Sequence, residues 1–206
     1  MKRWLMAVTL AVTLLPTVGW AAEQNPQELI KGTANDVLSR LSEEKDRLKD
    51  NPQAIYDLIK DRVLPQFDFE RMSRWVLGKY WRRADEGQKE RFMEEFRNLL
   101  VRTYATSLLD YTDQKIEYLP LREDPSSGEV TVRSEIAQPG AFPVPVHYTL
   151  YKTDDGRWLV YDLSIDGVSL VANYRSSFAK TIRAEGLDGL IDNLAQRNQQ
   201  GLDAQG

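Results

Sequence analysis

Hydrophobic positions recur every three or four residues along the first half of the chain, which is the spacing of amphipathic helices. Four segments follow this spacing: residues 26–41, 52–63, 68–77 and 85–111. Asn25-Pro26 and Asn51-Pro52 mark the starts of the first two, because asparagine is a good N-cap and proline suits the first helical position. Asp85 with Gln88 resembles a capping box for the fourth. The pattern predicts a helical N-terminal half.

From residue 116 onward, hydrophobic residues recur at every second position, which is typical of half-buried strands. The alternation runs through four segments: residues 116–119, 130–136, 144–151 and 158–165. Turn residues separate these segments, among them Pro139-Gly140 and Asp154-Asp155-Gly156. We therefore expect an antiparallel meander of about four strands, and helices followed by such a sheet belong to the α+β class.

The last of these strands meets a helix at Asp166-Gly167. Helical spacing resumes with Val168, Val171, Tyr174 and Phe178, and a final helix is predicted from about Asp188. When a strand with an apolar face is followed, after a single glycine, by a helix with an apolar side, the chain forms a corner. We interpret this corner as the floor of a cavity; a filled core would give the same periodicity, and the pattern alone leaves both open.

The N-terminal residues 1–21 have the organisation of a secretory signal peptide. Lys2 and Arg3 precede an apolar segment at residues 4–15, and Gly19 and Ala21 are the small residues before a cleavage site. The apolar segment is too short to span a bilayer, and there is no cysteine for lipid attachment. We expect an exported protein in which residues 22–206 form one domain without disulfides.

The formal net charge of −4 becomes more negative when Lys2 and Arg3 are removed with the signal peptide. A negative domain of this kind argues against nucleic acid as a partner and against tight binding to anionic bilayers.

Residues suited to catalysis or metal binding are sparse. The chain has no cysteine, and His147, its one histidine, is expected to be a structural residue on a strand. No Gly-x-Ser-x-Gly motif positions a serine nucleophile, and no carboxylates are spaced to complete a zinc site. Asp162 and Asp166 are the candidate acid–base pair, although Asp166 beside Gly167 is more simply a turn or capping residue. We predict no catalytic residue, metal or cofactor.

Several motifs together resemble the MlaC family of periplasmic phospholipid-binding proteins, also called toluene-tolerance or ABC-transporter auxiliary proteins. The most specific is the stretch 166–178, with the sequence DGVSLVANYRSSF. Leu77 to Trp81, Phe92 to Tyr104, Trp158 to Asp162 and Gly186 to Leu190 follow the family's order, and the resemblance covers nearly all of the mature chain.

The resemblance implies a curved antiparallel sheet related to the NTF2-like cone, with helices that enclose an apolar pocket for phospholipid tails. It implies a monomer in the Gram-negative periplasm, which shuttles lipid between an outer-membrane lipoprotein–porin complex and an inner-membrane ABC transporter with an MCE subunit. This Mla pathway maintains outer-membrane lipid asymmetry. On this basis the expected lipid contacts are Trp75, Tyr80, Leu100, Tyr104, Leu108, Val132, Val144, Val146, Tyr148, Leu150, Tyr161, Leu163, Val168, Val171, Tyr174 and Phe178.

Two other functions remain compatible with the residues. An exported enzyme on an NTF2-like cone would use Asp162 or Asp166 as a base with a tyrosine as proton donor, and would turn over a small apolar substrate. An interaction module with a fully packed core would bind partners by its surface and hold no extractable ligand.

Overall fold

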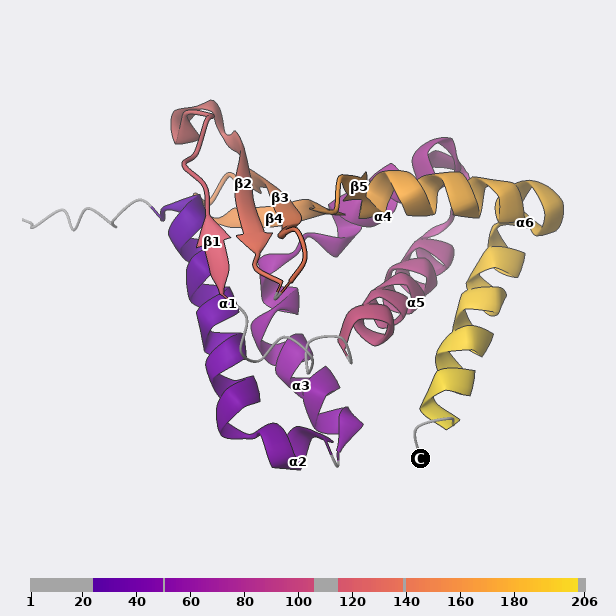
Figure 1. The fold of residues 1–206 in the computed structure, drawn as a ribbon. Helices are drawn as coiled ribbons and strands as arrows, with labels where there is room; N and C mark the ends of the chain where they lie inside the picture. The colour runs from indigo at the N-terminus through magenta and orange to yellow at the C-terminus, as the bar shows by residue number, and fades with distance from the viewer. Residues whose placement is uncertain (1–23, 50, 106–114, 139, 204–206) are drawn as a thin grey trace, which may run out of the picture.

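The computed structural model describes residues 24–49, 51–105, 115–138 and 140–203 (Figure 1). The α-helices of this part of the chain are α1 (Pro26–Glu43), α2 (Lys45–Lys49), α3 (Pro52–Arg62), α4 (Phe69–Leu77), α5 (Glu86–Ala105) and α6 (Leu170–Asp203). The strands are β1 (Ile116–Tyr118), β2 (Glu129–Ile136), β3 (Val144–Lys152), β4 (Trp158–Ile165) and β5 (Val168–Ser169). The α+β class is confirmed, with helices first and the sheet after. Within the described ranges, no helix is both long and apolar enough to cross a bilayer.

The predicted helix starts are confirmed by their caps. The Asn25 side chain accepts hydrogen bonds from the backbone N–H groups of Gln27 and Glu28, at 2.9 and 3.3 Å. Asp68 accepts from the Arg71 N–H at 2.8 Å and so begins α4. The capping box before α5 is complete, because Gln88 N donates to the Asp85 carboxylate at 2.8 Å and Asp85 N donates to the Gln88 side chain at 3.2 Å. The helix predicted to residue 111 is seen to Ala105, and the rest lies outside the described residues.

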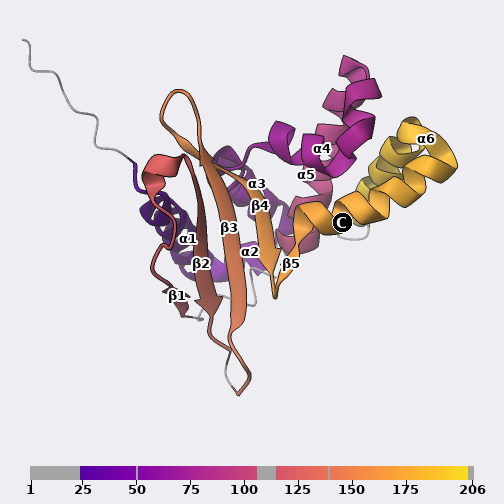
Figure 2. The ribbon, with the colours of Figure 1, turned by 90° about the horizontal axis from the view of Figure 1, so that it is seen from above.

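The five strands form one open sheet in the order β1-β2-β3-β4-β5, with every neighbouring pair antiparallel (Figure 2). The expected antiparallel meander of about four strands is confirmed, and a short fifth strand, β5, extends it. A register shift between Thr149 and Leu150 marks a bulge in the pairing of β3 with β4. The bulge lets Val160 pair with Leu150 while Asp162 pairs with Thr149.

The added strand β5 corrects the prediction at the corner, where Val168 was expected to begin a helix. Asp166 and Gly167 have φ values of 51° and 78°, which suit a two-residue turn with both central residues in the left-handed region. The chain reverses there, so that Val168 pairs with Ile165. The helix begins two residues later, at Leu170.

Helix α6 also changes direction at a glycine. Gly186 has non-helical angles, with φ 80° and ψ 177°, and divides α6 into two parts (Figure 1). The second part corresponds to the helix predicted from about Asp188, and its predicted apolar side, Leu190, Ile191 and Leu194, is buried.

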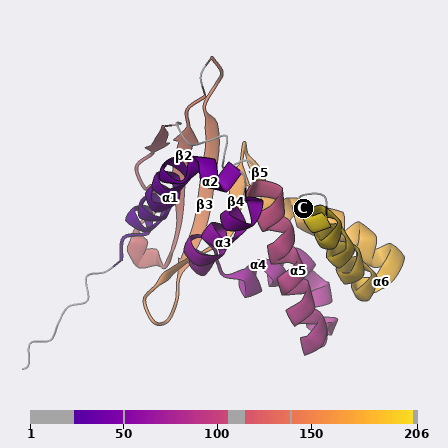
Figure 3. The same cartoon turned by 90° about the horizontal axis from the view of Figure 1, so that it is seen from below.

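The helices cover the sheet unevenly. Helices α1 to α3 lie against one face of the sheet, as the views from above and below show (Figures 2 and 3). Helices α4, α5 and α6 lie beside the sheet, past strand β4 (Figure 1). The chain before α4 also covers part of the free edge of β4, because Asp68 N donates to the Val160 carbonyl at 2.9 Å and Phe67 forms a parallel bridge with Val160.

Three separate groups of buried apolar residues follow from this arrangement. The helical core belongs mainly to α4, α5 and α6 and consists of Phe69, Met72, Val76, Leu77, Trp81, Phe92, Phe96, Leu100, Tyr161, Leu170, Val171, Phe178, Ile182, Leu190, Ile191 and Leu194. The sheet-face cluster consists of Ile30, Val130, Val132, Leu150, Trp158 and Val160. The α1–α3 cluster consists of Val37, Leu41, Leu48, Ile55, Ile59 and Ala105.

Candidate functional site

The strand register builds an apolar surface on the face of the sheet that α1 covers. Val132 of β2 lies opposite Tyr148 of β3, which lies opposite Leu163 of β4. Residues directly opposite one another in antiparallel strands project to the same face, so these three side chains form a row. The next row is Ser134, Val146 and Ile165. The result is a continuous, mostly apolar surface across the central strands.

Helix α1 and two connections close this surface. Ile30 of α1 is buried in the sheet-face cluster, and Leu29, Phe67 and Leu121 pack against it. The side chain of Gln27 donates to the Leu119 carbonyl at 2.9 Å and so joins the start of α1 to the end of β1. The first turns of α1 are therefore held against one end of the sheet.

The interior between the sheet and α1 to α3 is not one continuous core in the described part of the chain. Helix α1 contributes Ile30 to the sheet-face cluster but Val37 and Leu41 to the α1–α3 cluster, and the two remain separate. Val146 is buried, yet it belongs to none of the three clusters of described residues. The mostly apolar face of β2 and β3, with the buried Val146, is the candidate site for an apolar ligand.

Polar atoms with no protein partner also lie in this interior. The Tyr118 hydroxyl and the Trp158 indole N–H are buried and make no hydrogen bond to any described residue. Burial raises the pKa of Tyr118, and the neighbouring Tyr148 raises it further. Burial likewise raises the pKa of Tyr148. Because buried polar groups nearly always have a partner, these atoms are available to water or to a bound molecule.

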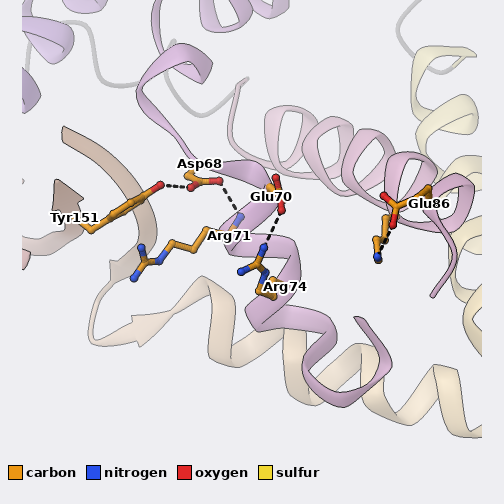
Figure 4. Close-up of polar contacts among 7 residues, drawn as sticks. Asp68, Glu70, Arg71, Arg74, Glu86 and Tyr151 are labelled. Atoms are coloured by element: carbon orange, nitrogen blue, oxygen red, sulfur yellow. Dashed lines mark hydrogen bonds and ion pairs between the residues drawn. The ribbon is translucent and has the colours of Figure 1, made fainter. Parts of the chain in front are cut away.

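The other end of β3 and β4 is closed by a polar network. The Arg71 guanidinium lies 3.9 Å from the ring centre of Tyr151 and 4.6 Å from that of Tyr161. Tyr151 donates a hydrogen bond to Asp68, as Figure 4 shows, and Tyr161 donates to Glu129. Burial, and then the Glu129 carboxylate, raise the pKa of Tyr161 to about 12. These contacts bind α4 to the sheet.

The structure divides the predicted lipid contacts between two places. Val132, Tyr148 and Leu150 belong to the sheet-face cluster or pack against it, and Val144 and Val146 lie on the same strand as Tyr148. Eight others are buried in the helical core or pack against it, namely Tyr80, Leu100, Tyr104, Tyr161, Leu163, Val171, Tyr174 and Phe178. Leu163 belongs to both places, because it also lies in the row with Val132 and Tyr148. Trp75 and Val168 are 47% and 53% exposed, and Leu108 lies outside the described residues.

The helical core is filled by aromatic side chains. Phe92 and Phe96 are stacked with their ring centres 5.6 Å apart. Tyr174 meets Phe96 edge to face at 5.4 Å and lies 5.3 Å from Phe178. Rings at such distances stabilise one another directly. The predicted positions in this group therefore have the surroundings of core residues.

Some residues of the candidate site were missed by the sequence interpretation. Tyr118 and Ser134 lie on strands that were predicted, and Ile30 lies on the apolar side of the first helix. Their spacing indicated burial but not which face of the sheet they would share. Phe67 precedes α4 in a segment whose apolar residues show neither helical nor strand spacing, so the sequence did not indicate its place in the site.

The acid–base candidates have structural partners. The Asp162 carboxylate accepts from the Ser169 hydroxyl at 2.6 Å and from the Leu163 and Val171 N–H groups at 2.9 and 3.1 Å. It thereby caps the start of α6. Asp166 is exposed in the β4–β5 turn. His147 lies on β3 between Arg133 and Ser164 of the neighbouring strands. Among the residues described, no three histidines or carboxylates come together as a metal site.

Two clefts are charged rather than apolar. The larger, of about 350 Å³, lies at the α1–α2–α3 turns and is lined by charged residues such as Arg40, Arg62 and Asp61. The smaller, of about 140 Å³, lies between α5 and α6 and includes Arg102 and Arg197. Neither lining suits hydrocarbon.

Comparison with known proteins gives consistent matches over nearly the whole chain. The family model described as MlaC protein matches residues 31–196. The intermembrane phospholipid transport system binding protein MlaC of Haemophilus influenzae is 27% identical over 203 residues, which cover 97% of this chain and 95% of that protein. The toluene tolerance protein ttg2D of Pseudomonas putida is 30% identical over 198 residues, 95% of this chain and 89% of that one.

A solved structure is similar in both sequence and fold. It is that of a phospholipid-binding protein from Ralstonia solanacearum in complex with a phospholipid. The TM-score is 0.80 at 31% sequence identity, and the match covers 86% of this chain and 98% of the other.

Proposed function

This chain belongs to the MlaC protein family, and we propose that it is a phospholipid carrier whose lipid tails lie between the sheet and helices α1 to α3. The observation that carries the proposal is the uncharged, mostly apolar face of β2 and β3 beneath α1, to which the buried Val146 belongs. The similar Ralstonia solanacearum protein was solved with a phospholipid bound.

The proposed tail contacts are the sheet-face residues. Val132, Val144, Val146, Tyr148 and Leu150 follow one another on β2 and β3 without a formal charge on this face. The predicted residues of the helical core would support the site from the side rather than contact the tails. Tyr118 and Trp158 would present their polar atoms to the ester region of a lipid or to water that accompanies it.

The energetics favour a carrier that works by exchange. Burial of one methylene contributes about 0.8 kcal/mol, so removal of two long acyl chains from water contributes on the order of 20 kcal/mol. A bilayer offers the same gain. Loading and release would then depend on differences of about 1–3 kcal/mol that a partner imposes on the two states of the carrier.

We propose further that the protein acts in the periplasm of a Gram-negative cell as a monomer without catalytic activity. It would exchange lipid with an inner-membrane ABC transporter that has an MCE subunit and with an outer-membrane lipoprotein–porin complex. Such transfer would maintain outer-membrane lipid asymmetry. The name of the matched Haemophilus influenzae protein supports a transport role over an enzymatic one.

Native mass spectrometry of the mature protein, purified from the periplasm without detergent, tests the proposal. We expect an added mass that organic extraction removes and identifies as phospholipid. An unliganded mass that stays unchanged after incubation with phospholipid vesicles would refute the carrier function.

A matched pair of variants tests where the tails lie. Val146→Glu places a charge at a buried site, whereas Val168→Glu places the same charge at a position that is 53% exposed. We expect Val146→Glu to lose the lipid mass and Val168→Glu to keep it, with circular dichroism to show that both fold. If Val146→Glu does not fold, Val146→Phe fills the same space without charge. Lipid loss from Val168→Glu alone would move the tails to the Gly167 corner.

A further inference from the structure

The two ends of the sheet differ sharply in charge. At one end, the β1–β2 connection and the β3–β4 turn carry Arg122, Glu123, Asp124, Asp154, Asp155 and Arg157. At the other end, the β2–β3 connection has no charged residue from Ile136 to Val146. Loop tips in water are usually polar, so an uncharged connection of this length needs another explanation.

The end of the sheet with this uncharged connection exposes apolar side chains. Phe142 is 93% exposed, and Ala141 and Pro143 beside it are exposed as well. Val168 in the neighbouring β4–β5 hairpin is 53% exposed. The two connections lie at the same end of the sheet, because Asp166 N donates to the Pro145 carbonyl at 2.9 Å and Val146 pairs with Ile165 (Figure 2). We call Ala141, Phe142, Pro143 and Val168 the apolar tip.

The apolar tip continues into the candidate lipid site along β3. Val144 is half-buried, Val146 is buried, Tyr148 is half-buried and Leu150 is fully buried, all at alternate positions of one strand. Residues at alternate positions of a strand share a face. A hydrocarbon chain that follows this face passes from the exposed end of the sheet to its buried middle.

From this continuity we propose that the apolar tip is the part of the protein that enters a lipid bilayer, where it lets acyl chains move between the membrane and the sheet face. The inference rests on the proposed function as a phospholipid carrier. The tip would reach only into the interfacial region, as short apolar segments do on a membrane surface.

The chemistry of the tip favours a bilayer over a protein partner. A stable protein interface buries about 800 Å² on each side and usually centres on tyrosine, tryptophan or arginine. The tip offers four residues, of which one is a phenylalanine and the others are small or aliphatic. Lys115 and Asp166, both exposed, adjoin it with opposite charges, so it carries no strong attraction for an anionic partner.

The test compares Phe142→Ser with Phe142→Trp, and uses Asp154→Ser at the charged end of the sheet as a control. Both Phe142 and Asp154 are exposed, so the substitutions should leave the fold intact. Transfer of a fluorescent phospholipid between protein-free phosphatidylcholine vesicles is measured together with the lipid mass of each purified variant. We expect Phe142→Ser to slow transfer roughly tenfold, the factor that partial burial of a phenylalanine ring contributes. Phe142→Trp and Asp154→Ser should transfer as the original chain does.

A second readout separates this inference from the proposed function. The fluorescence of the tryptophan introduced by Phe142→Trp is obtained as the difference from the original chain, which has other tryptophans. This difference should shift to shorter wavelength with vesicles if the tip enters them, whether or not the protein carries lipid.

The outcomes of the two readouts are distinct. A Phe142→Ser variant that keeps its lipid mass and transfers at the original rate would overturn the inference while the carrier function stands. A Phe142→Ser variant that transfers lipid more slowly only after partner proteins are added to the vesicles would also overturn the inference, because the tip would then bind protein. A chain that carries no lipid but shows the fluorescence shift would overturn the carrier function, and with it the movement of acyl chains past the tip, while the entry of the tip into the bilayer stands.

Discussion

The helical core and the sheet-face cluster both bury large aromatic side chains, but they pack them differently. In the helical core, Phe92, Phe96, Tyr174 and Phe178 contact one another at ring-centre distances of 5.3 to 6.0 Å. In the sheet-face region, Tyr118, Tyr148 and Trp158 have no ring contact with one another among the described residues. The Tyr118 hydroxyl and the Trp158 N–H also lack protein partners there.

The difference supports the proposal that the helical core is complete by itself and that the sheet-face region holds the ligand. Aromatic rings that contact one another contribute to stability beyond their buried area. Rings and polar atoms that are buried without such contacts leave interactions for another molecule to make. The helical core would then supply most of the stability of the lipid-free protein, and the sheet-face region would supply the affinity for lipid.

The largest expected effect is the loss of a ring from the helical core. Phe96 is fully buried and contacts three other rings, so Phe96→Ala removes both apolar burial and aromatic contacts. We expect the free energy of unfolding to fall by about 3–5 kcal/mol, measured by denaturant titration of the lipid-free protein. The fraction that remains folded should still take up phospholipid. A loss below about 1 kcal/mol would mean that the helical core is not the main source of stability.

The next largest effect is expected when a larger side chain is placed in each of the two regions. Ile191 lies in the helical core and is fully buried, so Ile191→Phe should overpack it and cost about 1–3 kcal/mol of unfolding free energy. Val146→Phe should cost less than about 1 kcal/mol in the lipid-free protein, because the proposed tail site would leave room for the larger side chain, and should lower the bound lipid seen by mass spectrometry. Equal costs at the two sites with unchanged lipid would remove the distinction between the regions.

Local features of the fold could be predicted because neighbouring residues determine them. The caps at Asn25 and Asp68 need only a side chain and the N–H groups two or three residues ahead. The Asp166-Gly167 turn was also visible in the sequence, but the two-residue strand after it was not. Val168 fits a helical stripe and a strand equally well, and its pairing with Ile165 depends on the reversal of the chain.

The candidate site could be predicted only in part. The spacing of apolar residues indicates which side chains are buried, but not which other side chains they contact. Tyr148 and Tyr174 both lie at periodically spaced positions that predict burial. Tyr148 packs against the sheet-face cluster, however, and Tyr174 packs against the helical core. Tyr118 and Phe67 reach the site from segments far apart in the sequence. Which of several amphipathic helices covers which face of the sheet is a property of the whole fold.

The smallest expected effect is a loss of stability in acid, and it comes from an ion pair at the charged end of the sheet. Arg133 of β2 holds Glu123 of the β1–β2 connection with two hydrogen bonds, at 2.7 and 3.0 Å. The Arg133 hydrogen bonds lower the Glu123 pKa from 4.5 to about 2. Because the folded pKa is the lower one, the pair stabilises the fold above about pH 4.5 and loses this contribution as the pH falls toward 2.

Glu123→Gln should therefore lower the unfolding free energy at pH 7 by at most about 1 kcal/mol, since solvent screens the pair, and by less at each step toward pH 2. Denaturant titrations of both proteins across this range measure the difference. Asp192→Asn on α6 is the matched control, because its 2.6 Å ion pair with Arg91 joins α5 to α6 and is more than half exposed on both sides. A Glu123→Gln effect that does not shrink with acid would assign its cost to packing of the β1–β2 connection. The pH dependence of the unfolding free energy would then not distinguish the charged end of the sheet from the helical core.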